Sequence, residues 1–183
     1  HSWYRRQRQM CIRDSKSIYE ETVATLKATS EFMTVGDARE EGTLVGPVIT
    51  ETHRDRVESF IQSGIDDGAE VIVGGERPDR DGYFIAPTLL AGCNPDMHVV
   101  KEEAFGPVVV VMSHDGDEHA VELANDSHYG LFSYVYAGNT TRAYDIAQKL
   151  ESGNVALNTI APHMYAPFGA VSYTHLRAHE TNQ

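Results

Sequence analysis

The chain has 183 residues, with 15 Lys and Arg against 27 Asp and Glu and a formal net charge of −12. Its length fits about one domain, and its 41% hydrophobic content excludes a disordered or collagen-like chain. An acidic chain repels phosphate backbones and anionic lipid surfaces, so we expect neither a nucleic-acid nor a membrane partner. No run of 18 apolar residues occurs and only two cysteines are present. These counts predict no transmembrane helix and a reducing, cytoplasmic location.

The two ends of the chain differ from the rest. Residues 1–15 carry four Arg and one Asp, and neither end has a helical or strand period. If Met10–Asp14 is written ATG TGT ATA AGA GAC, its reverse complement reads Val171–His175. The ends thus resemble the two strands of one inverted DNA element, similar to the transposon end of sequencing-library adaptors. We expect residues 1–15 and 171–183 to be non-native tails outside the fold. Residues 16–170, at net −15, would then be the natural part and a piece of a longer gene.

Between these ends, helical and extended patterns alternate along the chain. The expected elements are, in order, a helix over 18–33, a helix starting at Thr50 or Thr52 and ending near 64–68, strands over 71–73 and 87–90, an extended piece over 98–100, a central strand over 108–112, a helix over 117–125, a strand over 131–136, a helix from Asn139 or Thr140 to Glu151, and a strand over 155–157. Strands that alternate with helices predict an α/β fold, with a layered, mostly parallel sheet and flanking helices.

The residues that most often carry chemistry do not form a complete unit. Cys93 follows a predicted strand without a neighbouring His, and a reactive thiolate needs a base, a cation or a helix N-terminus. We interpret it as an ordinary packing or surface cysteine. His114 and His119 are five residues apart in an acidic segment, which favours a solvated loop over a metal site. The G-x-G-x-x-G, P-loop and G-x-S-x-G patterns are absent.

One acidic stretch, Lys101–Pro107 (K-E-E-A-F-G-P), leads through a Gly-Pro turn into the most apolar predicted strand. One interpretation is a solvated acidic loop. In the other, a carboxylate accepts hydrogen bonds from a ribose diol and Phe105 offers an apolar wall to a ring. The residues alone leave both interpretations open.

The same stretch resembles the E-E-x-F-G-P-V signature of the aldehyde dehydrogenase superfamily. Further pieces follow in the order of that family and cover nearly all of 17–170. They are V-G-D at 35–37, G-P-V-I at 46–49, R-V at 56–57, F-I at 60–61, G-G at 74–75, G-Y-F at 82–84, P-T at 87–88, Y-G-L at 129–131, G-N-V at 153–155 and P-F-G at 167–169. The resemblance implies part of the catalytic domain of an enzyme that oxidises an aldehyde with NAD or NADP. The family reaction passes through a cysteine thiohemiacetal and a thioester.

The resemblance also implies roles for single residues. Glu103 corresponds to the acid that holds the nicotinamide ribose hydroxyls, and Phe105 to the residue beside the nicotinamide ring. His53 and Arg56 lie where the family often contacts the ribose.

On the substrate side, Phe168 lies beside the family's tunnel for a small-molecule aldehyde. The variable loop nearby makes His163, Met164 and Tyr165 candidates for aldehyde specificity. The resemblance further implies that the parent enzyme is a homodimer or homotetramer.

The sequence also departs from the family. The family nucleophile lies upstream of Ser17 in a G-Q-x-C context, and Arg8–Cys11 lacks that glycine. The general-base glutamate and the cofactor domain lie further upstream. We therefore expect no catalytic residue in this chain and no activity of the chain alone. Two alternatives stay open: a non-catalytic structural or interaction form of the fold, and a relative acting on acyl-CoA or acyl phosphate.

Overall fold

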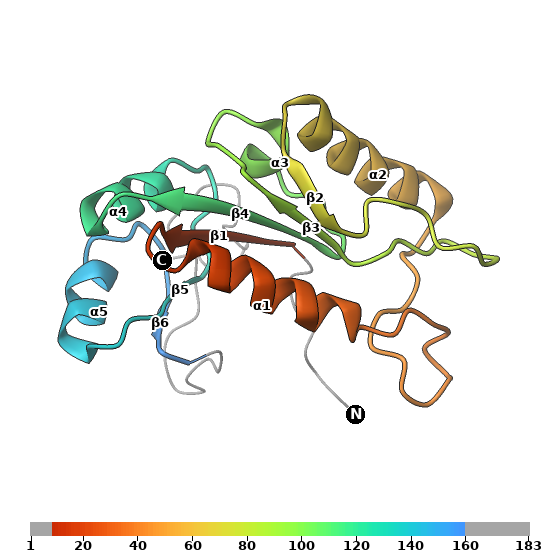
Figure 1. Cartoon of the computed structure of the whole chain (residues 1–183), viewed down its shortest axis with the longest axis horizontal. Coiled ribbons are helices and arrows are strands. Elements are labelled where there is room, and N and C mark those ends of the chain that lie inside the picture. The colour runs from red at the N-terminus through yellow and green to blue at the C-terminus, as the bar shows by residue number, and fades with distance from the viewer. Residues whose placement is uncertain (1–8, 160–183) are drawn as a thin grey trace, which may run out of the picture. The chain divides into compact units, whose positions relative to one another are not determined.

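The computed structural model of the chain describes residues 9–159 (Figure 1). The chain divides into two compact units, of which the first ends at His114 and the second begins at Asp115. The first unit holds the acidic stretch singled out from the sequence, and with it all the described residues of the expected cofactor site.

The first unit is a four-stranded sheet with helices on both faces. Its elements are β1 (Gln9–Ser15), α1 (Tyr19–Glu31), α2 (Glu51–Asp66), β2 (Glu70–Val73), β3 (Thr88–Ala91), α3 (His98–Lys101) and β4 (Val108–His114). The strand order is β1-β4-β3-β2. β4 pairs in parallel with both β1 and β3, whereas β2 is antiparallel to β3. The α/β fold with a mostly parallel sheet is thereby confirmed.

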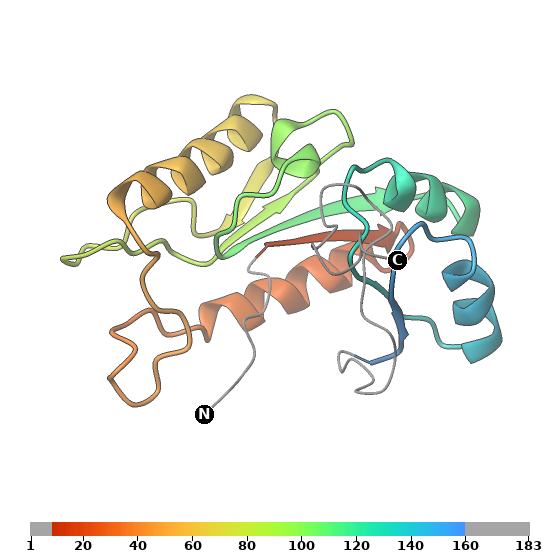
Figure 2. The ribbon, with the colours of Figure 1, turned by 180° about the vertical axis from the view of Figure 1, so that it is seen from behind.

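The two faces of this sheet bury different helices (Figure 2). On one face, Val23 of α1 packs into a cluster with Leu89 and Val111. The other face carries α2 and α3, where Gly64 of α2 lies against Leu90 and Val99. Neighbouring residues of a strand point to opposite faces, so β3 supplies Leu89 to one layer and Leu90 to the other. The strand predicted to be central, β4, lies between β1 and β3, and five of its seven residues are buried.

The expectation that residues 1–15 lie outside the fold is wrong for Gln9–Ser15. These residues form β1, the edge strand paired with β4 over seven positions. The sequence gives no period here because an edge strand forms largely through backbone hydrogen bonds, which do not depend on side-chain type. Ile12 packs against the apolar cluster. Asp14 fits less well, because its Oδ2 is buried without a hydrogen-bond partner.

Other boundaries differ in detail from those expected. Residues 98–100 belong to the short helix α3 and are not extended. Their apolar run has no period of its own, and packing of the fully buried Val99 decides the conformation. Of the two possible caps for α2, Thr50 is the one that accepts a hydrogen bond from the backbone of His53. Asn139 likewise caps α5 (Thr140–Ala147), which ends before the expected Glu151.

Over residues 115–159, the second unit pairs two helices with a two-stranded sheet. It contains α4 (Asp117–Asn125), β5 (Ser133–Val135), α5 and β6 (Val155–Leu157), and β5 and β6 are parallel. Arg142 forms an ion pair with Asp117, and Lys149 with Glu118. Asn125 donates to Lys149 O and accepts from Glu151 N, both at 2.9 Å. These polar contacts tie α4 to α5 and to the segment that follows it.

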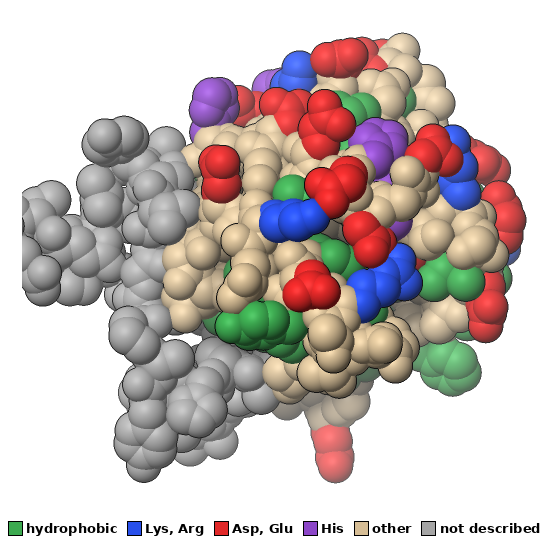
Figure 3. Space-filling view, turned by 90° about the vertical axis from the view of Figure 1, so that its left-hand side faces the viewer, with side chains coloured by type: hydrophobic (Ala, Val, Ile, Leu, Met, Phe, Trp, Pro, Cys, Tyr) green, Lys and Arg blue, Asp and Glu red, His purple; other side chains and the backbone are tan. Residues whose placement is uncertain are grey.

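The surface reflects the acidic composition. In Figure 3, acidic side chains are spread over the visible face and the basic ones lie among them. No helix in residues 9–159 combines the length and the apolar character needed to cross a membrane.

Candidate functional site

Helix α2 forms one wall of the candidate site. Its N-terminus is fixed by Thr50, whose Oγ1 accepts from His53 N at 3.1 Å. Val57, Phe60 and Ile61 lie on its buried face at helical spacing. His53 and Arg56 stand three positions apart, so they share one side of the helix.

That side of α2 faces the loop 102–107 and holds its backbone. His53 Nε2 lies 3.1 Å from Phe105 O, and Arg56 Nη2 donates to Glu103 O at 3.3 Å. A carbonyl oxygen only accepts hydrogen bonds, so a hydrogen bond between these two atoms requires a proton on Nε2 of His53. The structure thus brings together all four residues expected at the cofactor, and two of them contact the backbone of the other two.

The loop has an unusual backbone. Phe105 has φ of 55°, and among residues 9–159 only Asn158 shares this left-handed conformation without being glycine. A bulky residue rarely adopts it, because its Cβ then crowds the backbone. The next residue, Gly106, is packed so closely that a Cβ there would lie 2.4 Å from Val57 Cγ1. Pro107 O accepts from Thr88 N at 2.9 Å, which joins the loop to β3.

The loop presents an exposed aromatic ring two residues after a half-buried acid. The Phe105 side chain is 55% exposed, whereas the preceding Ala104 is fully buried. Glu103 is half-buried, two residues before Phe105. An ionised carboxylate accepts hydrogen bonds from a diol, and a ring face packs against a flat heterocycle. These residues fit the nicotinamide riboside half of a dinucleotide.

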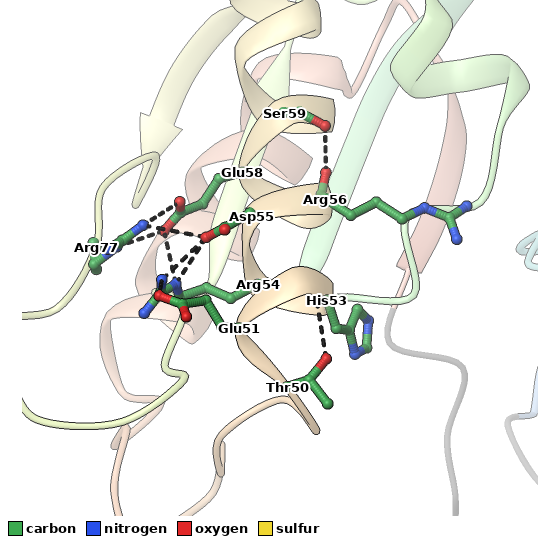
Figure 4. A network of polar contacts seen from close by, with 9 residues as sticks. All are labelled: Thr50, Glu51, His53, Arg54, Asp55, Arg56, Glu58, Ser59 and Arg77. Atoms are coloured by element: carbon green, nitrogen blue, oxygen red, sulfur yellow. Dashed lines mark hydrogen bonds and ion pairs between the residues drawn. The ribbon is translucent and has the colours of Figure 1, made fainter.

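The opposite side of α2 carries an ion-pair network (Figure 4). Arg54 is only 8% exposed and donates to Glu51 at 2.9 Å and to Asp55 at 3.0 Å. Arg77, from the loop after β2, donates to Glu58 at 2.6 Å. Figure 4 shows these residues on one side of the helix, with His53 and Arg56 on the other. Sequence reasoning missed this network, although acids at −3, +1 and +4 from Arg54 are its signature.

Neither cysteine is placed as an activated nucleophile. Cys93 is 7% exposed, and burial raises the pKa of its thiol to about 11. Its Sγ lies 3.6 Å from Leu90 O, as expected of a packing cysteine. Cys11 is half-buried, and desolvation raises its pKa, with Arg13 lowering it in part and Glu103 adding to the rise. A thiol needs a lowered pKa to act as a nucleophile at neutral pH.

Of the remaining candidate residues, the histidines considered for a metal site lie within residues 9–159, and those expected at the substrate lie outside. His119 Nδ1 accepts from Asp115 N at 3.1 Å, so this ring serves the turn before α4. Within residues 9–159, no three His, Cys, Asp or Glu side chains are grouped as a metal site. The expected substrate-side residues His163, Met164, Tyr165 and Phe168 lie outside the described residues.

Comparison with known proteins agrees with the signature found in the sequence. Residues 6–176 match the model of the aldehyde dehydrogenase family. Geranial dehydrogenase of Castellaniella defragrans is 38% identical over 154 residues, which cover 84% of this chain and 32% of that protein. Betaine aldehyde dehydrogenase of Bacillus subtilis is 34% identical over 171 residues, covering 88% and 35%. The chain thus spans about a third of the length of the curated relatives it matches.

Solved structures give the same result. Mycobacterium tuberculosis aldehyde dehydrogenase complexed with NAD+ superimposes with a TM-score of 0.88 at 34% identity, over 91% of this chain and 35% of that one. Betaine aldehyde dehydrogenase from Staphylococcus aureus in complex with NAD+ gives 0.86 at 35% identity, over 91% and 34%. The family match covers most of the chain, and its loop 102–107 carries the family signature. The chain belongs to the aldehyde dehydrogenase family.

Proposed function

We propose that the whole protein oxidises an aldehyde to a carboxylic acid with NAD or NADP, and that this chain contributes the surface that binds the nicotinamide riboside. The observation that carries the proposal is the Phe105 ring, which a left-handed backbone leaves 55% exposed two residues after Glu103. The names of the relatives, which include geranial and betaine aldehyde dehydrogenases, support aldehyde oxidation. These names also favour aldehyde oxidation over a reaction of acyl-CoA or acyl phosphate.

In this proposal each residue has a stated task. A nicotinamide held by these residues would supply the hydride acceptor. The Glu103 carboxylate accepts hydrogen bonds from the two ribose hydroxyls, which are charge-assisted and directional. The Phe105 ring packs against the nicotinamide and excludes water from one of its faces. The family reaction, through a cysteine thiohemiacetal and a thioester, requires a nucleophile that is neither Cys11 nor Cys93.

We further propose that this chain alone does not turn over substrate. The raised thiol pKa values of Cys11 and Cys93 support this, since each thiol stays protonated at neutral pH. The test is a hydride-transfer assay with the 183-residue chain, NAD+ and an aldehyde. We expect no NADH above the blank, and aldehyde-dependent NADH formation would contradict the proposal.

Cofactor binding is tested by titrating the isotope-labelled chain with NAD+ and following its amide resonances. We expect saturable shifts in the loop 102–107. Replacing Glu103 by Gln removes the charged acceptor and should weaken binding about tenfold or more. The matched control is Glu102→Gln, which changes the neighbouring exposed acid by the same atoms and should leave the affinity unchanged. Equal effects of the two substitutions would refute the role of Glu103.

The non-native origin of residues 1–15 and 171–183 also stays a proposal. The buried, unpartnered Oδ2 of Asp14 supports it for the first segment, because a strand shaped by its sheet would place an apolar side chain there. The family match extends to residues 6 and 176, beyond both predicted boundaries. Sequencing the source DNA tests the proposal, which fails if natural coding sequence runs through both boundaries.

A further inference from the structure

We infer that His53 and Arg56 are positioning residues: they hold the backbone of the loop 102–107 in the left-handed conformation that presents Phe105. The inference rests on the proposed function for what the loop binds, and it adds how the loop is held.

The backbone at Phe105 needs such support. A non-glycine residue in the left-handed region persists only where its surroundings hold it there. His53 fixes the carbonyl of Phe105, and Arg56 fixes the carbonyl of Glu103. These two carbonyls belong to the peptide groups on either side of the Ala104–Phe105 pair. Fixing both restricts the dihedral angles between them, including the positive φ of Phe105.

The geometry of α2 suits this task. Two donors three residues apart on a helix meet two carbonyls two residues apart on the loop. On the opposite side of the helix, Arg77 from the loop after β2 donates to Glu58, which ties that side of α2 to a neighbouring segment. Gly106 lies directly against the side chain of Val57 on the same helix, so the loop packs closely on α2.

The conformation of Phe105 can be measured directly. At a positive φ the amide proton and Hα of a residue approach each other, which gives a strong intraresidue NOE in the isotope-labelled full chain. His53→Gln keeps an N–H donor and Arg56→Lys keeps a charged one, so each should retain this NOE. The double variant His53→Leu with Arg56→Leu removes both donors and should lose it. The control is Gln62→Leu, an exposed donor further along α2 that bonds Asp66 instead of the loop.

Each outcome decides for or against the inference. An unchanged Phe105 NOE in the double variant would overturn it. If the double variant fails to fold, as judged by its amide dispersion, His53→Leu alone serves: we expect a weakened NOE, and an NOE equal to that of the unsubstituted chain overturns the inference.

A titration with nicotinamide mononucleotide separates this inference from the proposed function. Loss of the NOE in the double variant, together with no binding by the unsubstituted chain, would support positioning and refute the proposed function. Unchanged binding and an unchanged NOE in the double variant would refute positioning and leave the proposed function intact. An unchanged NOE with binding weakened about tenfold would also overturn the inference, because the loop would keep its conformation without the two donors.

Discussion

Gly106 of the loop 102–107 lies so close to the side chain of Val57 on helix α2 that there is no space for a Cβ on Gly106. A Cβ on Gly106 would lie 2.4 Å from Val57 Cγ1 and 2.9 Å from its Cγ2. Val57 is fully buried and has no room to retreat. The glycine of the F-G-P motif is therefore required by packing.

Gly106→Ala should destabilise the chain by about 1–3 kcal/mol, the usual cost of overfilling a packed interior. Urea unfolding followed by circular dichroism measures it. Gly138→Ala is the control, because a Cβ at Gly138 meets nothing within 4 Å. Equal unfolding free energies for the two variants would contradict the close contact.

Substitutions at Phe105 separate backbone strain from ring contact. Asn tolerates the left-handed region, whereas a β-branched residue does not. Phe105→Asn should change the unfolding free energy by less than about 0.5 kcal/mol, and Phe105→Val should lower it by about 1–2 kcal/mol. Both variants lose the ring, so both should bind NAD+ more weakly. If the Phe105→Val and Phe105→Asn variants had equal unfolding free energies, the backbone at position 105 would not be strained.

The Arg54 network should contribute to stability. Arg54→Met keeps the apolar stem and removes the donor shared by Glu51 and Asp55, whose side chains are 66% and 56% exposed. Because water can hydrate these carboxylates, we expect a loss of about 1 kcal/mol in unfolding free energy. Arg39→Met breaks a comparable pair with Asp37, but Arg39 is 90% exposed, so its loss should be below about 0.5 kcal/mol. A loss of similar size in both variants would contradict the importance of burial.

The thiol of Cys93 should react slowly and with a displaced pH dependence. Its pKa of about 11 lies above the ordinary 9.0, because burial disfavours the thiolate. In a Cys11→Ser background, the alkylation rate should keep rising about tenfold per pH unit from pH 8 through 10. An unburied thiol would level off near its ordinary pKa. A plateau at pH 9, or equal rates with and without urea, would contradict the burial of Cys93.

The raised pKa of the Cys93 thiol also makes the unfolding free energy depend on pH. The protonated form fits the native state, so the contribution is fully present below pH 9. It is lost as the pH rises towards 11, where the native thiol must ionise.

Asp14 offers a test of how well β1 fits its sheet. Its Oδ2 is buried without a partner, which costs free energy that an apolar side chain would not. Asp14→Val should raise the unfolding free energy by about 1–2 kcal/mol. Glu70→Val at the exposed start of β2 is the control and should stay within about 0.5 kcal/mol. A destabilised Asp14→Val chain would mean that the carboxylate has a structural task.

Periodicity and capping residues predicted α1, α2, α4 and β4, because each has a strong pattern and defined ends. β1 could not be found this way, since its residues alternate poorly and its pairing depends on the backbone of β4. α3 was missed because four residues are too few for a period. Local sequence therefore predicts the elements that bury a regular face, and tertiary contacts decide the short ones.

The candidate site shows the same division. The motif at Glu103 and Phe105 is contiguous in sequence, so it was recognised directly. The contacts of His53 and Arg56 with the loop join segments about 50 residues apart, and spacing cannot reveal which backbone atoms they reach. The strained φ of Phe105 was also hidden, because phenylalanine carries no signal for a left-handed conformation.

The most direct test of the central claim compares the two halves of the dinucleotide on the isotope-labelled chain. Nicotinamide mononucleotide carries the ring and ribose that Phe105 and Glu103 are proposed to bind, whereas adenosine monophosphate carries the other half. We predict that the first shifts the amide resonances of Glu103, Phe105 and Gly106 in a saturable way and that the second does not. Equal shifts with both ligands, or none with the first, would contradict the account.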